Sequence, residues 1–178
     1  MKDVLDVSQW NKSFNPLDYD SVYIRGSIGA TGKDTKTYDH VLTCENARTR
    51  YGFYHLFKPE KDVDEQIRNF KEVLDTYNFK LMPAVDVELN EMKFYPETIS
   101  LNLKLFCDKL NLYGAGLVIY TGAWFWNPSI LRSYDAYFSK YPLWVASYTK
   151  EPIIPRTWNN NKYFMWQYKG GASKRNDK

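Results

Sequence analysis

Two acidic side chains that follow an apolar segment carry the strongest chemical signal in this sequence. The residues from Leu81 to Val85 run directly into Asp86 and Glu88, which a single valine separates. Side chains on a β-strand alternate between two faces, so these carboxyl groups would share a face, with their backbones roughly 6.5 Å apart. Two close acids that lose water repel each other, which raises the pKa of one above that of the other. Such a pair suits acid catalysis on a sugar bond, and the alternative is a strand that simply ends in a polar loop.

The elements that would position this pair are predicted from hydrophobic periodicity. Apolar or alternating segments predict β-strands at 4–10, 22–28, 51–57, 80–88, 116–121, 143–148 and 163–168. Amphipathic segments predict helices between them, at 38–50, 62–77, 96–112 and 128–140. Strands and helices in alternation predict a parallel sheet, and the helices fade after residue 143. We therefore predict an α/β fold, one domain over residues 1–178, in the form of a shortened and irregular TIM-like barrel.

Local signals set the expected helix boundaries. Asp62 followed by Glu65 resembles a capping box at the start of the second helix. Pro96 falls in the first turn of the third helix, and Gly114 lies just past its end. The fourth helix is expected to begin at Pro128.

Polar and aromatic side chains collect where the predicted strands end. In a parallel barrel the carboxyl ends of the strands converge on one mouth, where active sites are built. We expect a single site at that mouth. The candidate residues are Asp6, Ser8, Gln9, Arg25, Ser27, Tyr54, His55, Asp86, Glu88, Tyr120, Thr121, Ser147, Tyr148, Trp166, Gln167 and Tyr168.

Composition narrows the class of ligand. Aromatic residues make up 17% of the chain, and aromatic rings stack on sugar rings and on bases. The net charge is only +3 and no long run of like charges occurs, which argues against nucleic-acid binding. The 2 Cys and 2 His residues supply almost no material for a metal site. We therefore expect no metal, no cofactor and no nucleic-acid partner.

Seven short motifs follow one another in order along nearly the whole chain. They are Asp6-Val7-Ser8-Gln9-Trp10, Tyr23-Ile24-Arg25, Gly52-Phe53-Tyr54-His55, Asp86-Val87-Glu88, Ile119-Tyr120-Thr121, Leu143-Trp144-Val145-Ala146 and Trp166-Gln167-Tyr168. This ordered set resembles glycoside hydrolase family 25, the Chalaropsis-type lysozymes, many of which are bacteriophage endolysins. The resemblance implies a (β/α)5(β)3 barrel, which agrees with the barrel predicted above.

The resemblance also implies an activity and roles for the acids. The activity is hydrolysis of the β-1,4 bond between N-acetylmuramic acid and N-acetylglucosamine in peptidoglycan. By this likeness Glu88 is the general acid, while Asp86 and Asp6 supply the negative charge that an oxocarbenium-like transition state needs. We expect the substrate to contact Arg25, Tyr54, His55, Tyr120, Tyr148, Trp166, Gln167 and Tyr168.

Several candidate residues also have a plainer interpretation. Asp6 could cap a turn, and Arg25 could form a structural ion pair instead of pairing with an acid of the cluster. His55 could be a buried, hydrogen-bonded structural histidine, so we expect it only to line the site. Trp166 could pack in the core instead of contacting a sugar.

The sequence departs from the family at its C-terminal end. Family members usually follow Trp-Gln-Tyr with a last strand that carries an Asp-x-Asn motif, whose aspartate joins the acidic cluster. Here a polar segment follows Tyr168, and Asp177 is the candidate to replace that aspartate. Three explanations stay open: a degenerate eighth strand, closure of the barrel by another segment, or reduced activity.

Two other functions remain open at this stage. The first is a non-catalytic peptidoglycan-binding barrel, which the atypical C-terminal end would explain. The second is a chitinase-like hydrolase, since those enzymes also use an Asp-x-Glu strand end. Pro83, Ala84 and Val85 stand where the longer acidic motif of chitinases would place further aspartates.

The expected location follows from the absence of targeting signals. No apolar segment of the signal-peptide type follows Lys2, and no run of 18 apolar residues occurs. We expect no stable membrane insertion and no separate wall-binding domain. A phage endolysin would be made in the host cytoplasm and released to the cell wall by a holin.

Overall fold

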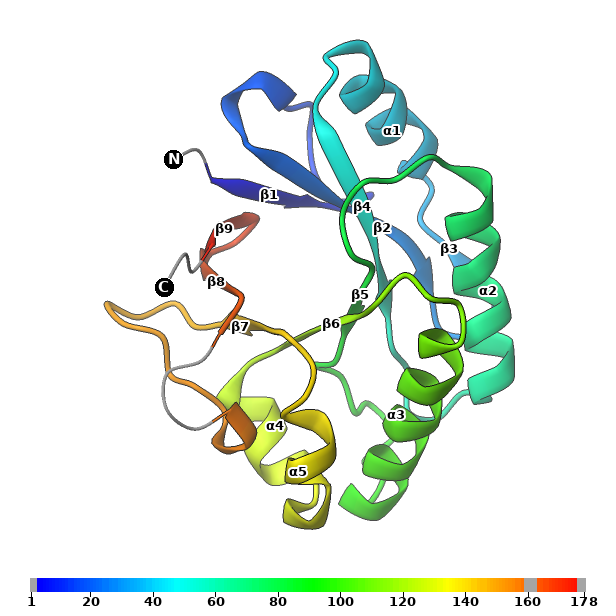
Figure 1. Cartoon of the computed structure of the whole chain (residues 1–178), viewed down its shortest axis with the longest axis vertical. Helices are drawn as coiled ribbons and strands as arrows, with labels where there is room; N and C mark the ends of the chain where they lie inside the picture. The colour runs from blue at the N-terminus through cyan, green and yellow to red at the C-terminus, as the bar shows by residue number, and fades with distance from the viewer. Residues whose placement is uncertain (1–2, 159–162, 176–178) are drawn as a thin grey trace.

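One nine-stranded sheet closes on itself in the computed structural model, which describes residues 3–158 and 163–175 (Figure 1). The strands run in the order β1-β9-β8-β7-β6-β5-β4-β2-β3, and a further pairing of β1 with β2 closes the barrel. The short β3 only extends the end of β2 as an antiparallel hairpin. The bounds are β1 Val4–Val7, β2 Ser21–Ile28, β3 Gly32–Lys33, β4 Arg50–Leu56, β5 Ala84–Asp86, β6 Val118–Thr121, β7 Leu143–Ala146, β8 Met165–Lys169 and β9 Ala172–Arg175.

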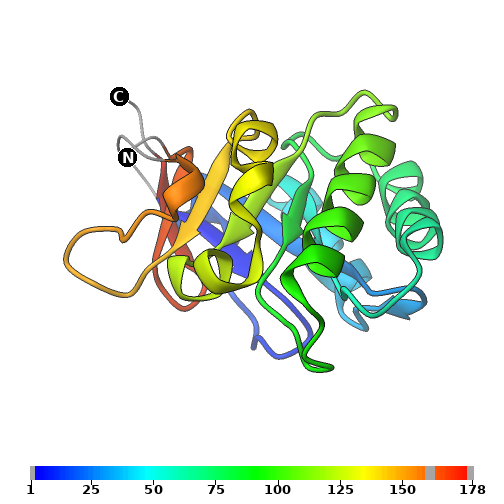
Figure 2. The ribbon, with the colours of Figure 1, turned by 90° about the horizontal axis from the view of Figure 1, so that it is seen from below.

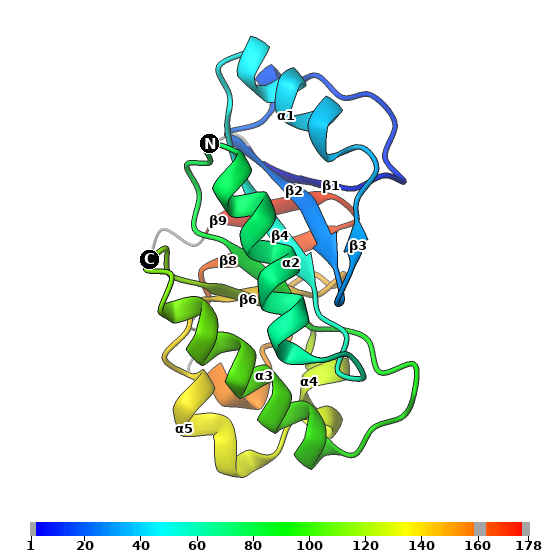
Figure 3. The same cartoon turned by 90° about the vertical axis from the view of Figure 1, so that its right-hand side faces the viewer.

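The helices lie outside one side of this barrel. Figures 2 and 3 show α2 and α3 packed against each other along the sheet, while β8 and β9 carry no helix in the described part of the chain. None of the described helices has the length and apolar character needed to cross a membrane. The helices are α1 Thr37–Asn46, α2 Val63–Thr76, α3 Pro96–Asn111, α4 Ala123–Ser129 and α5 Asp135–Phe138, with 3-10 turns at Pro16–Asp18, Arg132–Tyr134 and Arg156–Trp158.

The α/β class and the irregular TIM-like barrel predicted from the sequence are confirmed. Parallel pairing runs from β1 through β2, β4, β5, β6 and β7 to β8. Because side chains alternate along each strand, one set packs against the helices and the other fills the barrel. Phe53, Phe70 and Phe106 belong to the outer layer, and Tyr23 and Trp144 belong to the inner one, with ring centroids 4.8 Å apart.

The helix boundaries were predicted with mixed success. Asp62 caps α2 by accepting a 2.9 Å hydrogen bond from the backbone N–H of Glu65, and α3 begins at Pro96, as expected. The prediction of a single helix from 128 to 140 is wrong. Pro128 instead lies near the end of α4, and the chain is extended at Ile130 before the next turn begins. A proline can mark the start of a helix or weaken its last turn, and the sequence alone did not distinguish the two.

A strand not predicted from the sequence closes the barrel at its C-terminal end. β9 pairs in antiparallel fashion with β8 on one side and with β1 on the other. The chain turns back at Gly171, whose φ of 76° favours glycine and whose carbonyl accepts a 3.0 Å hydrogen bond from the backbone N–H of Asp6. Of the three explanations left open, the structure shows the first: the last strand is degenerate, short and polar, and it still closes the barrel. Asp177 lies outside the described residues.

Candidate active site

A cavity of about 130 Å³ opens among the carboxyl ends of the parallel strands. Every residue that lines it except Leu56 and Trp144 belongs to the predicted site. The lining residues are Asp6, Arg25, Tyr54, Leu56, Asp86, Glu88, Tyr120 and Trp144. The structure thus brings these predicted side chains together at one mouth.

The pair Asp86 and Glu88 reaches the cavity from the end of β5. The strand is shorter than the predicted 80–88 and ends at Asp86. The chain stays extended beyond it, because the backbone N–H of Val87 donates to the carbonyl of Tyr120 and the Thr121 hydroxyl donates to the carbonyl of Val87. The side chain of Val87 is buried in the outer core, so the two acids on either side of it both line the cavity.

Asp6 enters the cavity from β1 and is held by a glutamine. The side-chain amide of Gln167 donates to Asp6 Oδ2 over 2.9 Å. The amide oxygen of Gln167 in turn accepts from the hydroxyls of Tyr120 at 2.8 Å and Tyr148 at 2.7 Å. With its oxygen occupied by two donors, the amide can only offer its N–H groups to Asp6. Gln167 and Tyr148 therefore belong to the site although they do not line the cavity itself.

The three acids of the cavity hold protons more tightly than isolated carboxyl groups. Burial raises the pKa of Asp6 to about 6, although the hydrogen bond from Gln167 opposes the shift. Burial, and then the nearby Glu88, raises the pKa of Asp86 well above its usual range. Burial, and then the charge of Asp6, raises the pKa of Glu88, as the sequence had led us to expect. The cluster can therefore donate a proton near neutral pH.

Arg25 is the one basic side chain among the described residues that line the cavity. Its Nε donates to Asp34 Oδ2 over 2.8 Å, and its charge opposes the rise in the pKa of Asp86. Nη2 of Arg25 is buried and finds no hydrogen-bond partner among the described residues. Of the two interpretations left open, the structure shows an ion pair with an aspartate outside the acidic cluster.

His55 does not line the cavity, and that prediction is wrong. The side chain is fully buried on the outer face of β4, with its ring stacked on Phe106 at 5.2 Å. Its ring nitrogens are occupied by the hydroxyl of Ser27 at 2.8 Å and the amide oxygen of Gln66 at 3.2 Å. Burial lowers the pKa of His55 to about 4. It is the hydrogen-bonded structural histidine of the plainer interpretation.

Trp166 and Tyr168 also lie outside the cavity, in contrast to the prediction. They flank Gln167 on β8, and because Gln167 faces inward, both neighbours face outward. The indole N–H of Trp166 donates to the carbonyl of Ser147 over 2.6 Å, and the hydroxyl of Tyr168 donates to Asp3. Both side chains are thereby tied to the outer wall of the barrel.

Two tryptophans near the mouth were not predicted as site residues. Trp10 follows the end of β1 and is 80% exposed, and Trp124 follows the end of β6 and is 63% exposed. Tyr148, which was predicted, follows β7 and is 65% exposed. Apolar side chains that are exposed singly are ordinary on a protein surface, so it is the position of these three after strand ends that relates them to the mouth. Their place directly after a strand end is the sequence signal that could have identified them.

No group of three or more His, Cys, Asp or Glu side chains in the described part of the chain is arranged to hold a metal ion. The groups of the site that can do chemistry are its carboxyl groups, its arginine and its hydrogen-bonded amide.

These features define a closed β/α barrel with a cluster of proton-holding carboxyl groups at the carboxyl ends of its strands. The chain belongs to the glycosyl hydrolases family 25, whose sequence model matches residues 5–176. It is 27% identical over 153 residues to the autolytic lysozyme of Clostridium acetobutylicum, an alignment that covers 85% of this chain and 44% of that protein. The chain thus spans less than half the length of this curated relative.

Solved structures show the same fold. The muramidase from Acremonium alcalophilum superposes with a TM-score of 0.85 at 22% identity, covering 100% of this chain and 95% of that one. The bacterial lysozyme from Streptomyces coelicolor gives a TM-score of 0.82 at 22% identity, covering 98% and 92%. The catalytic domain of an endolysin from a bacteriophage of Listeria monocytogenes gives 0.75 at 22% identity, covering 99% and 94%.

Proposed function

We propose that the protein is a lysozyme that hydrolyses the β-1,4 bond between N-acetylmuramic acid and N-acetylglucosamine in bacterial peptidoglycan. The observation that carries this proposal is the group of three carboxyl side chains, Asp6, Asp86 and Glu88, in one cavity of a family 25 barrel. An autolytic lysozyme and a muramidase among the similar proteins support the choice of substrate.

Glu88 is the residue we assign as general acid. It is partly exposed, whereas Asp86 is buried, so the proton of Glu88 can reach a glycosidic oxygen that enters from the mouth. Its raised pKa keeps it protonated closer to neutral pH than an ordinary glutamate. As the glycosidic bond breaks, this proton passes to the leaving oxygen. Water then adds its hydroxyl to the anomeric carbon and returns a proton to the acidic cluster.

Asp6 stabilises the positive charge that develops on the sugar ring, and Asp86 does so when it has lost its proton. Asp6 is ionised above its pKa of about 6, and Gln167 holds the carboxylate in place. Asp86 Oδ1 is buried and finds no hydrogen-bond partner among the described residues, so it is free to contact the substrate.

The substrate-binding residues surround these acids. Arg25, Tyr54 and Tyr120 line the cavity and contact the sugar that is cleaved. Trp10, Trp124 and Tyr148 provide exposed aromatic surfaces at the mouth for the neighbouring sugars of the glycan chain, since an aromatic face packs well on the apolar face of a sugar ring. We assign no substrate contact to His55, Trp166 or Tyr168.

The proposal is tested by the release of reducing ends from purified peptidoglycan. Glu88→Gln keeps the shape of the side chain but removes its acidic proton, so we expect the rate to fall by about 10²- to 10⁴-fold, the usual contribution of a general acid. Glu97→Gln is the matched control, because Glu97 is exposed in the first turn of α3 and does not line the cavity. Circular dichroism verifies the fold of both variants. Wild-type rates from folded Glu88→Gln would refute the assignment, and an inactive, folded wild type would refute the lysozyme proposal.

The non-catalytic binding barrel loses the observation that motivated it. That alternative depended on a missing last strand, and β9 now closes the barrel. None of the described residues that line the cavity favours chitin over peptidoglycan. A comparison of the two polymers as substrates therefore distinguishes the chitinase-like alternative from the lysozyme proposal.

We also infer that the protein acts as a phage endolysin, reaching the cell wall from the host cytoplasm with the help of a holin. The support is the similarity in fold to endolysins, including the phage domain described above. A holin gene next to the coding sequence would agree with this inference, and a chromosomal setting among sporulation or autolysis genes would contradict it.

A further inference from the structure

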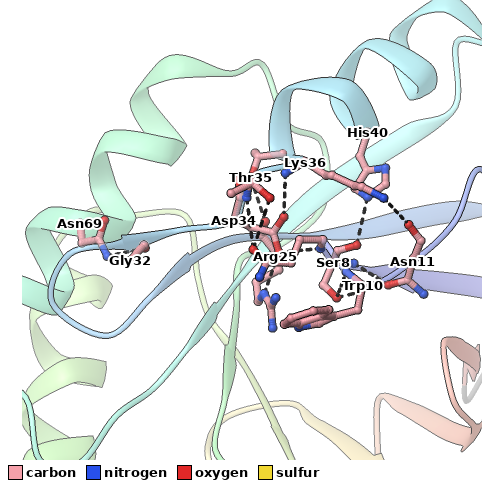
Figure 4. Close-up of polar contacts among 12 residues, drawn as sticks. Ser8, Trp10, Asn11, Arg25, Gly32, Asp34, Thr35, Lys36, His40 and Asn69 are labelled. Atoms are coloured by element: carbon pink, nitrogen blue, oxygen red, sulfur yellow. Dashed lines mark hydrogen bonds and ion pairs between the residues drawn. The ribbon is translucent and has the colours of Figure 1, made fainter.

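Asp34 is a buried aspartate outside the cavity to which the proposed reaction gives no role. It lies between β3 and α1, and its side chain has a relative exposure of 0%. Oδ2 accepts hydrogen bonds from Nε of Arg25 and from the backbone N–H of Gln9, both at 2.8 Å, and Oδ1 accepts from the backbone N–H of Lys36 at 3.0 Å (Figure 4). Three donors and one full positive charge stabilise this carboxylate.

The hydrogen bond from Nε of Arg25 to Asp34 fixes the orientation of the planar Arg25 guanidinium group. A guanidinium held at Nε cannot turn without breaking that bond, so its remaining nitrogens keep one orientation. The Arg25 side chain is only 10% exposed, lines the cavity, and has its buried Nη2 unpaired among the described residues. A buried donor without an acceptor destabilises the folded protein. Nη2 is therefore a group to which a ligand or an ordered water would bind.

The same aspartate ties down the loop that follows β1. This loop begins two residues after Asp6 and carries Trp10. Figure 4 shows it joined to the segment at 34–40 by several contacts besides that of Asp34. They are Thr35 N–H to Gln9 Oε1 at 3.4 Å, Lys36 Nζ to the carbonyl of Asn11 at 2.9 Å, and His40 Nε2 with the carbonyl of Ser8 at 3.2 Å.

We propose that Asp34 is a positioning residue for the active site: from outside the cavity it holds Arg25 against the three carboxyl groups and fixes the Trp10 loop to the same point. Of these three residues, Arg25 and Trp10 contact the substrate, and Asp34 acts only through them. The catalytic consequence of this arrangement rests on the proposed lysozyme function, whereas its electrostatic consequence does not.

The electrostatic consequence has a definite sign. Asp86 is faced by Asp6 from β1, Arg25 from β2, Tyr54 and Lys58 from β4 and the segment after it, Glu88 from its own segment, and Tyr120 from β6. Arg25 lowers the pKa of Asp86, and Asp34 partly neutralises Arg25. Removal of the Asp34 charge should therefore lower the pKa values of the cavity acids, whereas removal of the Arg25 charge should raise them.

The test is a titration of side-chain carboxyl groups followed by ¹³C NMR in wild type and three variants. We expect Asp34→Asn to lower the highest titration of the cluster and Arg25→Gln to raise it, each by at least about half a pH unit. Asp39→Asn, which removes the same charge from an exposed position on α1, should leave it unchanged. Asp34→Asn that titrates like Asp39→Asn would overturn the proposal.

Kinetics provide the second measurement and separate this proposal from the lysozyme function. The general acid must be protonated, so Asp34→Asn should move the basic limb of the kcat/KM profile to lower pH. It should also reduce the plateau of the profile. A loss of folded protein would lower the plateau but would not change the pH of the basic limb. If Asp34→Asn does not fold, Arg25→Lys replaces it. The lysine ammonium of this variant can pair with Asp34 but cannot also reach the substrate in the cavity, so kcat/KM should fall about tenfold or more. Unchanged kcat/KM there would refute the positioning role, whereas inactivity of the wild type would refute only the lysozyme proposal.

Discussion

Asp6→Asn should stabilise the protein while removing its activity, and the size of the effect follows from one pKa. Burial raises the pKa of Asp6 from the usual 3.8 to about 6, because the cavity disfavours the charged form. The raised pKa means that the native state prefers a protonated Asp6. The associated stability is fully present below pH 3.8 and is lost as the pH rises through about 6.

The magnitude is a shift of about 2 pKa units at 1.36 kcal/mol each, or about 3 kcal/mol. Asparagine carries no charge and can still accept the hydrogen bond from Gln167. Asp6→Asn should therefore be more stable than wild type by up to about 3 kcal/mol at pH 8 and by much less at pH 3.5. For a chain of this size the gain at pH 8 corresponds to a rise in Tm of about 6 to 12 °C.

Urea unfolding at the two pH values, followed by far-UV circular dichroism, measures this difference. Asp39→Asn is the control for the loss of an exposed carboxylate and should change stability little at either pH. Peptidoglycan hydrolysis by Asp6→Asn should fall sharply because the negative charge that stabilises the transition state is gone. If the stability difference between Asp6→Asn and wild type is the same at pH 8 and pH 3.5, the reasoning from burial is refuted.

Three further changes test other parts of the structure. Burial lowers the pKa of His55 to about 4, so the contribution of His55 to stability is lost as the pH falls from 6.5 towards 4, opposite in sign to that of Asp6; the stability of wild type relative to His55→Gln should therefore fall between pH 7 and pH 4.5, as urea unfolding would show, and a difference that does not change with pH would refute this. Trp10→Ala should raise KM for soluble glycan fragments with little change in kcat, and an unchanged KM would exclude the mouth-binding role. Ser173→Val should destabilise the fold by about 1–3 kcal/mol, because the buried Trp144 indole N–H loses its 2.9 Å acceptor on β9; thermal unfolding measures this, and a neutral result would mean that the indole finds another partner.

Much of the fold and the acidic centre of the site was predictable from local patterns. Hydrophobic periodicity identified the strands that pair in parallel, and the cap at Asp62 formed as its sequence predicts. Asp86 and Glu88 share a face because one residue separates them on an extended chain, and a spacing of two requires this whatever surrounds it. The same rule, applied strictly, would have excluded His55 once Tyr54 was taken as inward-facing, because neighbours on a strand point to opposite faces.

Other features depended on contacts between distant parts of the chain. β9 is a polar segment without alternation, and it becomes a strand only because β8 and β1 both offer it unpaired backbone groups. The raised pKa values likewise need Asp6, Asp86 and Glu88 to meet in one cavity that excludes water.

The sequence by itself thus determined which residues could do chemistry and which face of its strand each would occupy, because those properties are set by residue type and by the period of the backbone. Only the tertiary structure decided that Arg25 pairs with Asp34, that Gln167 holds Asp6, and that the barrel is closed. Partner choice and burial are properties of the assembled fold, since hydrogen bonds and desolvation depend on distances in space that no local spacing records.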